Sequence, residues 1–212
     1  MVAQETINVV KRGDRGKEPL NIQKIHDMVE YAVEDIKGVS ASQVEMQSGL
    51  QFYDGMSTDE IQQILIKSAA DLISLETPNY QYVAARLLLF SLRKQVIDKL
   101  WDHPHLYDHT KKCIEKGVYD SSILNLYERK DFDRMENWLN HNRDYDFTYA
   151  GLRQVIDKYL VQDRSTNVVY ETPQFMYMMI AATLFAKYPK ERRMSYVKKS
   201  VSYTHLRAHE TV

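Results

Sequence analysis

The sequence predicts a mainly α-helical fold, in which a small β-hairpin caps a four-helix bundle and a further helical segment with one β-hairpin follows. Only 7 glycines and 5 prolines interrupt the 212 residues. Apolar residues recur at helical spacing over most of the chain, whereas alternating runs around a polar turn occur at two places only. The length allows one generous domain or two small ones.

The first hairpin is expected near the N-terminus. The run Ile7–Val10 enters the glycine-bearing turn "KRGDRGK", and Leu20 with Ile22 suits the returning strand. Asn21 can cap the helix that follows, since its side chain can accept a hydrogen bond from a free backbone N–H of the first turn. Gly38 is expected to end that helix.

The next segment is ambiguous between a strand and a helix. Apolar residues alternate over 44–52 as in a strand, yet Ser40 and Gln43 form an S-x-x-Q capping box, which favours a helix. Ser57 and Glu60 form another box at the start of the third helix. A fourth apolar run follows Pro78, which is common at helix starts, and is expected to end near residue 101.

The second half is expected to continue in the same style. The stretch "KYLVQDRSTNVVYET" reads as a hairpin, because two alternating runs flank a Ser-Thr-Asn turn. Helices are predicted at 106–117, 121–140, 148–158, 173–187 and 189–199.

Composition narrows the class of protein. With 44% hydrophobic and 27% charged residues and a formal charge of −1, the chain has no overall basic field for nucleic acid. It contains no run of about 20 apolar residues and no charged-then-apolar leader, so no membrane partner and a cytoplasmic location are expected. The only cysteine, Cys113, excludes an internal disulfide and a four-cysteine zinc site, and is expected to be a small buried hydrophobe.

Positive charge is nevertheless concentrated around the first turn. Two acidic residues there, Asp14 and Glu18, are outnumbered by five basic ones, Lys11, Arg12, Arg15, Lys17 and Lys24. A helix start carries about half a positive charge and readily binds phosphate. Gly13 and Gly16 would let the backbone approach a ligand closely. A solvated hairpin turn explains the same pattern, and the turn sequence matches no Walker or dinucleotide fingerprint. The spacing of the residues alone leaves both explanations open, a phosphate site and a solvated turn.

For two other groups of polar residues we prefer a structural explanation to a functional one. His103, His105 and His109 could be drawn as a metal cluster, but they straddle a proline without an acidic partner, so a solvated turn is expected. Three acidic residues could be drawn as an acid pair, but their spacing on one helix fits a solvated face; they are Asp131, Asp133 and Glu136.

Several separated blocks keep both order and spacing, namely "VVKRGD", "EPLNIQKIH", "QFYDGMSTDEI", "KSAADLI", "PNYQYVAARL", "LYDH", "KYLVQDR" and "RRMSYVKK". Together they resemble the ATP-cone and the helical segment that open the large subunit of class Ia ribonucleoside-diphosphate reductases. The resemblance implies an allosteric effector site for ATP, which activates, or dATP, which inhibits, with Mg²⁺ accompanying the triphosphate. It also implies a radical-generating di-iron small subunit and other large subunits as partners of a full-length enzyme that makes deoxyribonucleotides.

Carried over position by position, the family's nucleotide contacts fall on Lys11, Glu18, Pro19, Leu20, Asn21, Ile22, Gln23, Lys24, Thr58 and Lys94. The three lysines suit phosphates as point charges, while Glu18 and Asn21 can hydrogen-bond a base or sugar. Gln62 stands where a histidine is often found in the family, and Pro19 stiffens the loop. No catalytic residue and no metal ligand are expected in this chain.

The resemblance implies a division into a regulatory ATP-cone at 1–100, a helical segment at 101–200 and, because the likeness stops near Ser200, a non-native tail at 201–212. The family's catalytic barrel and its cysteines lie outside this pattern, so the chain is expected to be inactive alone. The alternative is a nucleotide-sensing DNA-binding transcriptional regulator built on an ATP-cone. That family carries a cysteine-rich zinc ribbon before the cone, for which this sequence has no cysteines.

Overall fold

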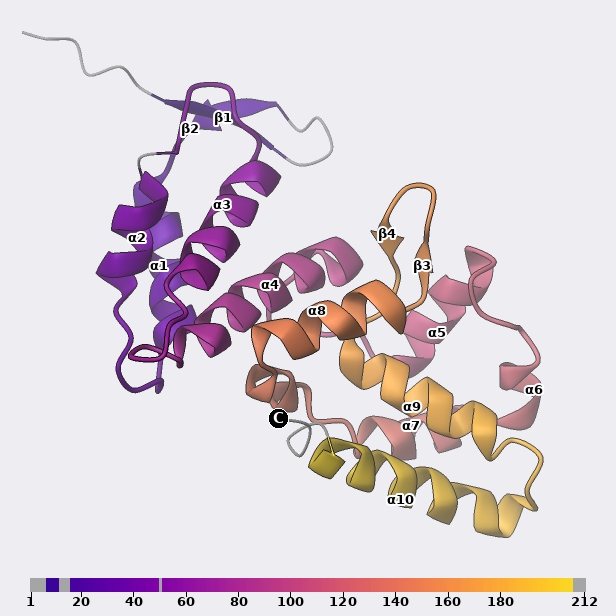
Figure 1. Ribbon diagram of the computed structural model, residues 1–212. Helices are drawn as coiled ribbons and strands as arrows, with labels where there is room; N and C mark the ends of the chain where they lie inside the picture. The colour runs from indigo at the N-terminus through magenta and orange to yellow at the C-terminus, as the bar shows by residue number, and fades with distance from the viewer. Residues whose placement is uncertain (1–6, 12–15, 50, 208–212) are drawn as a thin grey trace, which may run out of the picture. The chain divides into compact units, whose positions relative to one another are not determined.

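The computed structural model describes residues 7–11, 16–49 and 51–207, with side chains up to residue 202. The chain divides into two compact units (Figure 1). The first runs as far as Ser91 and includes Phe147–Leu152, and the second comprises Leu92–Asp146 and the residues from Arg153 onward. Among the described residues, no helix is long and apolar enough to cross a bilayer.

The first unit opens with the predicted hairpin, formed by β1 (Asn8–Val10) and β2 (Lys17–Pro19). The strands are antiparallel, with Val9 opposite Glu18. The returning strand was predicted too late in the chain, at Leu20 and Ile22. It ends before them because Ile22 is already the first residue of a helix.

Four helices follow, α1 (Ile22–Val33), α2 (Ala41–Gly49), α3 (Thr58–Asp71) and α4 (Tyr80–Ile97), and the last continues into the second unit. Figure 1 shows the hairpin across one end of α1 and α3. The Asn21 cap is confirmed, since its Oδ1 accepts from the Lys24 N–H at 3.1 Å. So is the box of Ser57 and Glu60, in which each side chain accepts from the other's backbone N–H.

The segment of ambiguous pattern is the helix α2, as predicted. Its start is held by a third residue that the sequence pattern did not indicate. The Ser40 N–H donates to the Tyr80 hydroxyl at 2.9 Å, and this hydroxyl donates to the side-chain oxygen of Gln43. The hydroxyl thus lies between the two members of the expected box and fastens the start of α2 to the start of α4.

The helices of the first unit pack through small and branched side chains that are fully buried, including Val29, Ala32, Val44, Leu65, Ala69, Val83 and Leu87. Burying a valine or leucine side chain contributes about 1.5–3 kcal/mol. The hairpin and the helix starts beside it therefore rest on a rigid base.

The second unit contains α5 (Leu106–Glu115), α6 (Ile123–Leu126), α7 (Arg129–Glu136), a 3-10 helix η1 (His141–Asp146), α9 (Pro173–Leu184) and α10 (Lys190–Arg207), and it takes the later part of α8 (Tyr149–Lys158). Its apolar core gathers around α9, which buries Phe175, Met178, Met179, Ala181 and Ala182. The predicted second hairpin is present as β3 (Gln162–Asp163) and β4 (Val168–Val169).

The single helix predicted at 121–140 was wrong, since α6 and α7 are separate. Tyr127 between them has an extended backbone and is buried, and its hydroxyl donates to the Ala182 carbonyl at 2.7 Å. Glu128 then caps α7 together with Asp131. The helical periodicity of this stretch does not produce one helix, because burial of the Tyr127 ring and the new cap at Glu128 favour a break between α6 and α7.

The last helix, α10, continues beyond residue 200, where the resemblance was expected to end, and Val201 is buried in the core of the second unit. The non-native tail at 201–212 stays a prediction. Residues 208–212 and the side chains from 203 onward lie outside the described part of the chain.

Candidate functional site

The hairpin brings Lys11 and Glu18 onto one face. Side chains alternate along a strand, so Lys11 shares a face with Val9, and Val9 lies directly opposite Glu18. Lys11 Nζ is 2.7 Å from Glu18 Oε2. Val9 is only 3% exposed, so this is the face that turns toward the helices, whereas Lys17 points from the other face.

A second ammonium group reaches the same carboxylate from another element. Lys24, in the first turn of α1, places Nζ 3.8 Å from Glu18 Oε1. The hydrogen bond from Lys11 and the charges of both lysines hold the pKa of Glu18 below its usual value. Two positive charges from the hairpin and the helix thus converge on one anion, beside the positive end of α1.

The start of α3 lies beside this cluster. Val10 and Ser57 form a parallel bridge, and the Val10 N–H donates to the Met56 carbonyl at 2.9 Å. The bridge therefore places the end of β1, which Lys11 follows, beside the start of α3, where Thr58 lies. The positive end of a second helix therefore lies beside the hairpin.

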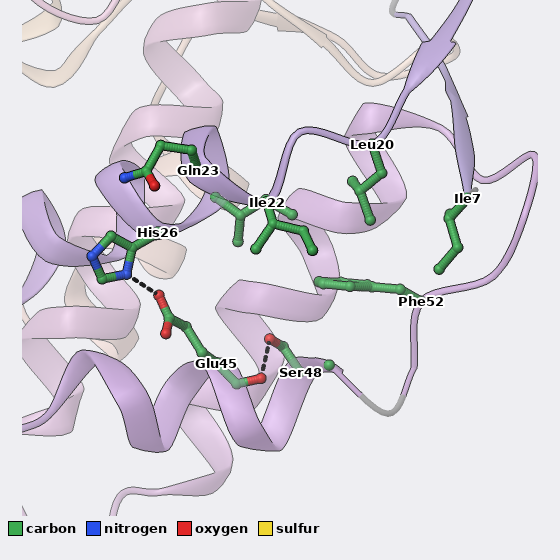
Figure 2. Close-up of a pocket in the computed structure, with 10 residues that line it drawn as sticks. Ile7, Leu20, Ile22, Gln23, His26, Glu45, Ser48 and Phe52 are labelled. Atoms are coloured by element: carbon green, nitrogen blue, oxygen red, sulfur yellow. Dashed lines mark hydrogen bonds and ion pairs between the residues drawn. The ribbon is translucent and has the colours of Figure 1, made fainter. Parts of the chain in front are cut away.

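A cavity of about 530 Å³ opens beside the same elements and is lined by Ile7, Leu20, Ile22, Gln23, Ile25, His26, Glu45, Ser48, Gly49 and Phe52. Figure 2 shows its apolar end, formed by side chains of the hairpin, of the start of α1 and of Phe52. At the other end His26 Nδ1 lies 2.8 Å from Glu45 Oε1. This hydrogen bond raises the pKa of His26.

The structure brings Lys11, Glu18 and Lys24 together, and the bridge from Val10 to Ser57 places the start of α3, which begins at Thr58, beside the hairpin. Three more of the expected residues line the cavity, namely Leu20, Ile22 and Gln23. Pro19 is exposed on β2, and Asn21 uses its side-chain oxygen as the cap of α1. Arg12 and Gly13, which the sequence also indicated, lie outside the described residues.

Two expected residues, Gln62 and Lys94, are not among those that line this cavity, and their roles as nucleotide contacts stay predictions. Gln62 is buried, and its Nε2 donates to the Leu87 carbonyl at 2.8 Å, so this amide joins α3 to α4 inside the first unit. Lys94 is exposed near the C-terminal end of α4 and belongs to the second unit.

Sequence reasoning missed the polar end of the cavity. His26 and Glu45 lie on α1 and α2, nineteen positions apart in the chain, and no local spacing indicates that they meet. Phe52 carried a signal, since it ends the alternating run 44–52, but that run was interpreted only as a choice between strand and helix, with a helix preferred.

The histidines of 103–109 do not form a site, and the prediction that they form a solvated turn was wrong. His103 stacks on His141, with ring centroids 3.7 Å apart, and His109 is buried against Phe175. His105 caps α5 by accepting from a backbone N–H. Among the described residues, no group of three or more histidine, cysteine or acidic side chains could hold a metal ion.

The acidic residues of α7 were expected on a solvated face, which is wrong for Asp131. Its buried carboxylate accepts from the Glu128 N–H at 3.1 Å and closes the cap of α7. Glu136 accepts from the Leu106 N–H at 2.7 Å, and exposed Asp133 pairs with Arg129. Cys113 is buried, as predicted, and burial raises the pKa of its thiol to about 11.

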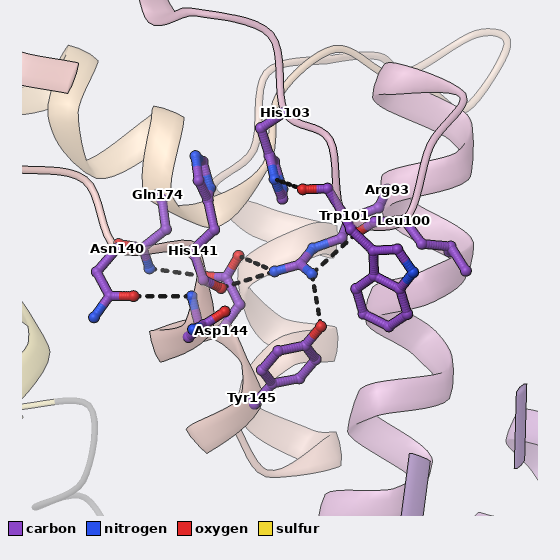
Figure 3. A network of polar contacts seen from close by, with 10 residues as sticks. Arg93, Leu100, Trp101, His103, Asn140, His141, Asp144, Tyr145 and Gln174 are labelled. Atoms are coloured by element: carbon purple, nitrogen blue, oxygen red, sulfur yellow. Dashed lines mark hydrogen bonds and ion pairs between the residues drawn. The ribbon is translucent and has the colours of Figure 1, made fainter. Parts of the chain in front are cut away.

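A polar network of the second unit was not foreseen at all (Figure 3). The guanidinium of Arg93, 1% exposed, donates to the His141 carbonyl at 2.7 Å, to the Tyr145 hydroxyl at 2.9 Å and to Asp144 Oδ2 at 3.5 Å. Asp144 also accepts from Gln174 Nε2 at 2.7 Å. Arg93, Asp144 and Gln174 are all buried, so we regard the network as structural.

Comparison with known proteins finds family matches in two parts of the chain. Residues 7–95 match the ATP cone domain, and residues 145–207 match the all-alpha domain of ribonucleotide reductase. The chain is 46% identical over 195 residues to the ribonucleoside-diphosphate reductase subunit alpha of Haemophilus influenzae, which covers 92% of this chain and 26% of that protein.

Two further relatives agree. Identity is 46% over 191 residues with the ribonucleoside-diphosphate reductase 1 subunit alpha of Escherichia coli, covering 90% of this chain and 25% of the relative. It is 39% over 179 residues with the subunit alpha of Helicobacter pylori, covering 84% and 22%. The chain spans about a quarter of the length of these relatives. It therefore belongs to the ATP-cone family over residues 7–95 and to the all-alpha domain family of ribonucleotide reductases over residues 145–207.

Proposed function

We propose that residues 7–95 bind ATP or dATP as an allosteric effector, with the triphosphate held by Lys11 and Lys24. The observation that carries this proposal is the convergence of these two ammonium groups, from β1 and α1, on a single anion. A triphosphate offers several anionic oxygens in a row, which charges from different elements can share. The starts of α1 and α3 add the positive ends of two helices.

The adjacent cavity supplies a place for the base. Binding sites for small molecules are usually concave and mostly apolar, with a few polar groups that fix orientation. Leu20, Ile7 and Phe52 provide the apolar walls, and their cavity begins where the hairpin meets α1. Mg²⁺ would accompany the triphosphate, since hard cations prefer phosphate oxygens.

We further infer that the chain is the regulatory N-terminal part of a reductase large subunit. The names of its relatives and their coverage support this assignment. The whole protein would then reduce ribonucleoside diphosphates together with a radical-generating small subunit, and ATP and dATP would favour different assemblies. Couplings of this kind typically amount to about 1–3 kcal/mol.

Calorimetric titration with ATP and with dATP tests the binding proposal. Lys11→Ala should weaken the binding of ATP about tenfold or more, because a hydrogen bond to a charged group is lost. Lys17→Ala is the matched control, since Lys17 lies on the same hairpin but points from the opposite face. It should leave the dissociation constant nearly unchanged.

Binding should also raise the melting temperature, and the rise should grow with the logarithm of the nucleotide concentration above the dissociation constant, because a ligand of the folded state stabilises it by mass action. If a folded sample shows neither heat nor a melting shift with either nucleotide at millimolar concentration, the effector proposal is wrong. If Lys11→Ala and Lys17→Ala bind equally well, the phosphates lie elsewhere.

A further inference from the structure

Glu18 occupies the two groups on which the proposed phosphate site depends. Its two carboxylate oxygens are directed at different lysines, Oε2 toward Lys11 at 2.7 Å and Oε1 toward Lys24 at 3.8 Å. Each ammonium group keeps further N–H donors for a phosphate, but the carboxylate already neutralises part of the positive charge that would attract it. Because the Glu18 carboxylate is part of the chain, it is present at the site in every molecule.

We propose that Glu18 is an internal competitor for the phosphates and sets the affinity of the effector site. This inference rests on the proposed function. Glu18 holds the lysines in place for an incoming triphosphate, and it weakens binding because the nucleotide replaces an existing ion pair instead of finding free charges.

The geometry allows this exchange without movement of the backbone. Glu18 lies in β2 opposite Val9, whose side chain is buried, so the strand is fixed. The side chains are not fixed, since those of Lys11, Glu18 and Lys24 are 40%, 32% and 67% exposed. Ion pairs in such surroundings are weak, because water screens them, and their partners exchange readily.

A different role for Glu18 is a direct hydrogen bond to the nucleoside, as the family resemblance implies. The two roles predict opposite effects of removing its charge. A competitor that is neutralised makes the binding of phosphates tighter, and more so for ATP than for AMP. A contact that is neutralised makes the binding of ATP, ADP and AMP weaker by the same factor.

Calorimetric titration of Glu18→Gln with the three nucleotides separates these roles. We expect about two- to fivefold tighter binding of ATP, in line with the modest strength of exposed ion pairs, and little change for AMP. The salt dependence of ATP binding should become steeper, because free lysines release counterions that a paired lysine does not hold. Asp27→Asn is the matched control: it removes one carboxylate charge from α1, where Asp27 accepts from Gln23, and should change ATP binding little.

A second measurement needs no variant. The lysines hold the pKa of the Glu18 carboxyl low. When ATP takes the lysines and adds negative charge nearby, the carboxyl pKa should rise, which carbon-detected NMR of the glutamate side chains can follow. The inference is overturned if the parent binds ATP while the Glu18 pKa stays unchanged, or if Glu18→Gln binds all three nucleotides more weakly. Failure of the parent to bind ATP at all would instead count against the proposed function.

Discussion

The two units use the same chemistry, a cation paired with a carboxylate, in opposite surroundings. In the first unit Lys11 and Glu18 meet at 2.7 Å with 40% and 32% of their side chains exposed. In the second unit Arg93 and Asp144 are 3.5 Å apart with 1% and 0% exposed. The shorter pair is the more exposed one, so distance alone does not tell which pair holds the fold together.

Surroundings decide the role of each pair. Water competes for an exposed pair, which therefore contributes little to stability and can exchange partners. A buried pair cannot lose one member without leaving an uncompensated charge in the interior. The hairpin cluster is consequently suited to binding an external anion, whereas the Arg93 network fixes the irregular segment around η1.

The largest effect is expected from breaking the buried pair. Arg93→Met removes the guanidinium and leaves Asp144 without a cation, which should lower the free energy of unfolding of the second unit by about 3–5 kcal/mol. Urea unfolding followed by tryptophan fluorescence reports this unit specifically, because both tryptophans of the chain, Trp101 and Trp138, lie in it.

The double variant Arg93→Met/Asp144→Leu is the control for that experiment. Removing both charges relieves the uncompensated carboxylate, so part of the lost stability should return. A loss below about 1 kcal/mol for Arg93→Met would contradict a structural role for the network.

A change of pH is expected to have a smaller effect on folding stability, and the effect should have opposite signs in the two units. Burial lowers the pKa of His103 to about 4 and that of His141 to about 3, against an ordinary value of 6.5. The unfolded chain takes up protons first, so the second unit loses stability as the pH falls from about 6.5 toward 4. Burial also lowers the pKa of His109 to about 4. It raises the pKa of Asp144 to about 6 and that of Glu171 above its usual value, which acts in the opposite sense, but three histidines outweigh these two carboxyls.

In the first unit the sign is reversed for His26, whose pKa is raised by Glu45. Its contribution is fully present below the unfolded pKa and is lost as the pH rises through the raised value. Urea unfolding across pH 4–8 checks the second unit, and hydrogen exchange of α1 and α2 checks the first. His141→Phe should flatten the acid-side loss, and an unchanged slope in that variant would refute the assignment.

The smallest effect is expected from breaking the exposed pair. Lys11→Ala should change the free energy of unfolding of the chain by no more than about 0.5 kcal/mol, since the pair is screened by water. Thermal and urea unfolding of this variant and of Arg93→Met under the same conditions compares the two losses of free energy of unfolding directly. Equal losses in the two variants would remove the distinction between the units.

Local signals in the sequence predicted much of the first unit. Asn21 and the Ser57–Glu60 box gave the starts of α1 and α3, because such caps act within one helical turn. The second strand was misplaced, because Leu20 and Ile22 suit a strand by residue type while the cap at Asn21 forces a helix.

Long-range partners explain what the sequence could not predict. Arg93 in a helix indicates a surface charge by itself, and only the fold brings Asp144 and Tyr145 to it. The positions of Lys11, Glu18 and Lys24 were expected, but their pairing depends on strand register. His26 and Glu45 carried no local signal of the cavity that they close.

The basic hairpin is proposed to bind a triphosphate. Competition binding of ATP, ADP and AMP to this chain, at two ionic strengths, tests it most directly. We expect affinity to fall steeply from ATP to AMP, because phosphate contacts are lost while those of the nucleoside remain. We also expect it to weaken with salt, because the charges are exposed. Equal affinity for all three nucleotides, unaffected by salt, would contradict the account and leave Lys11 and Lys24 as ordinary surface charges.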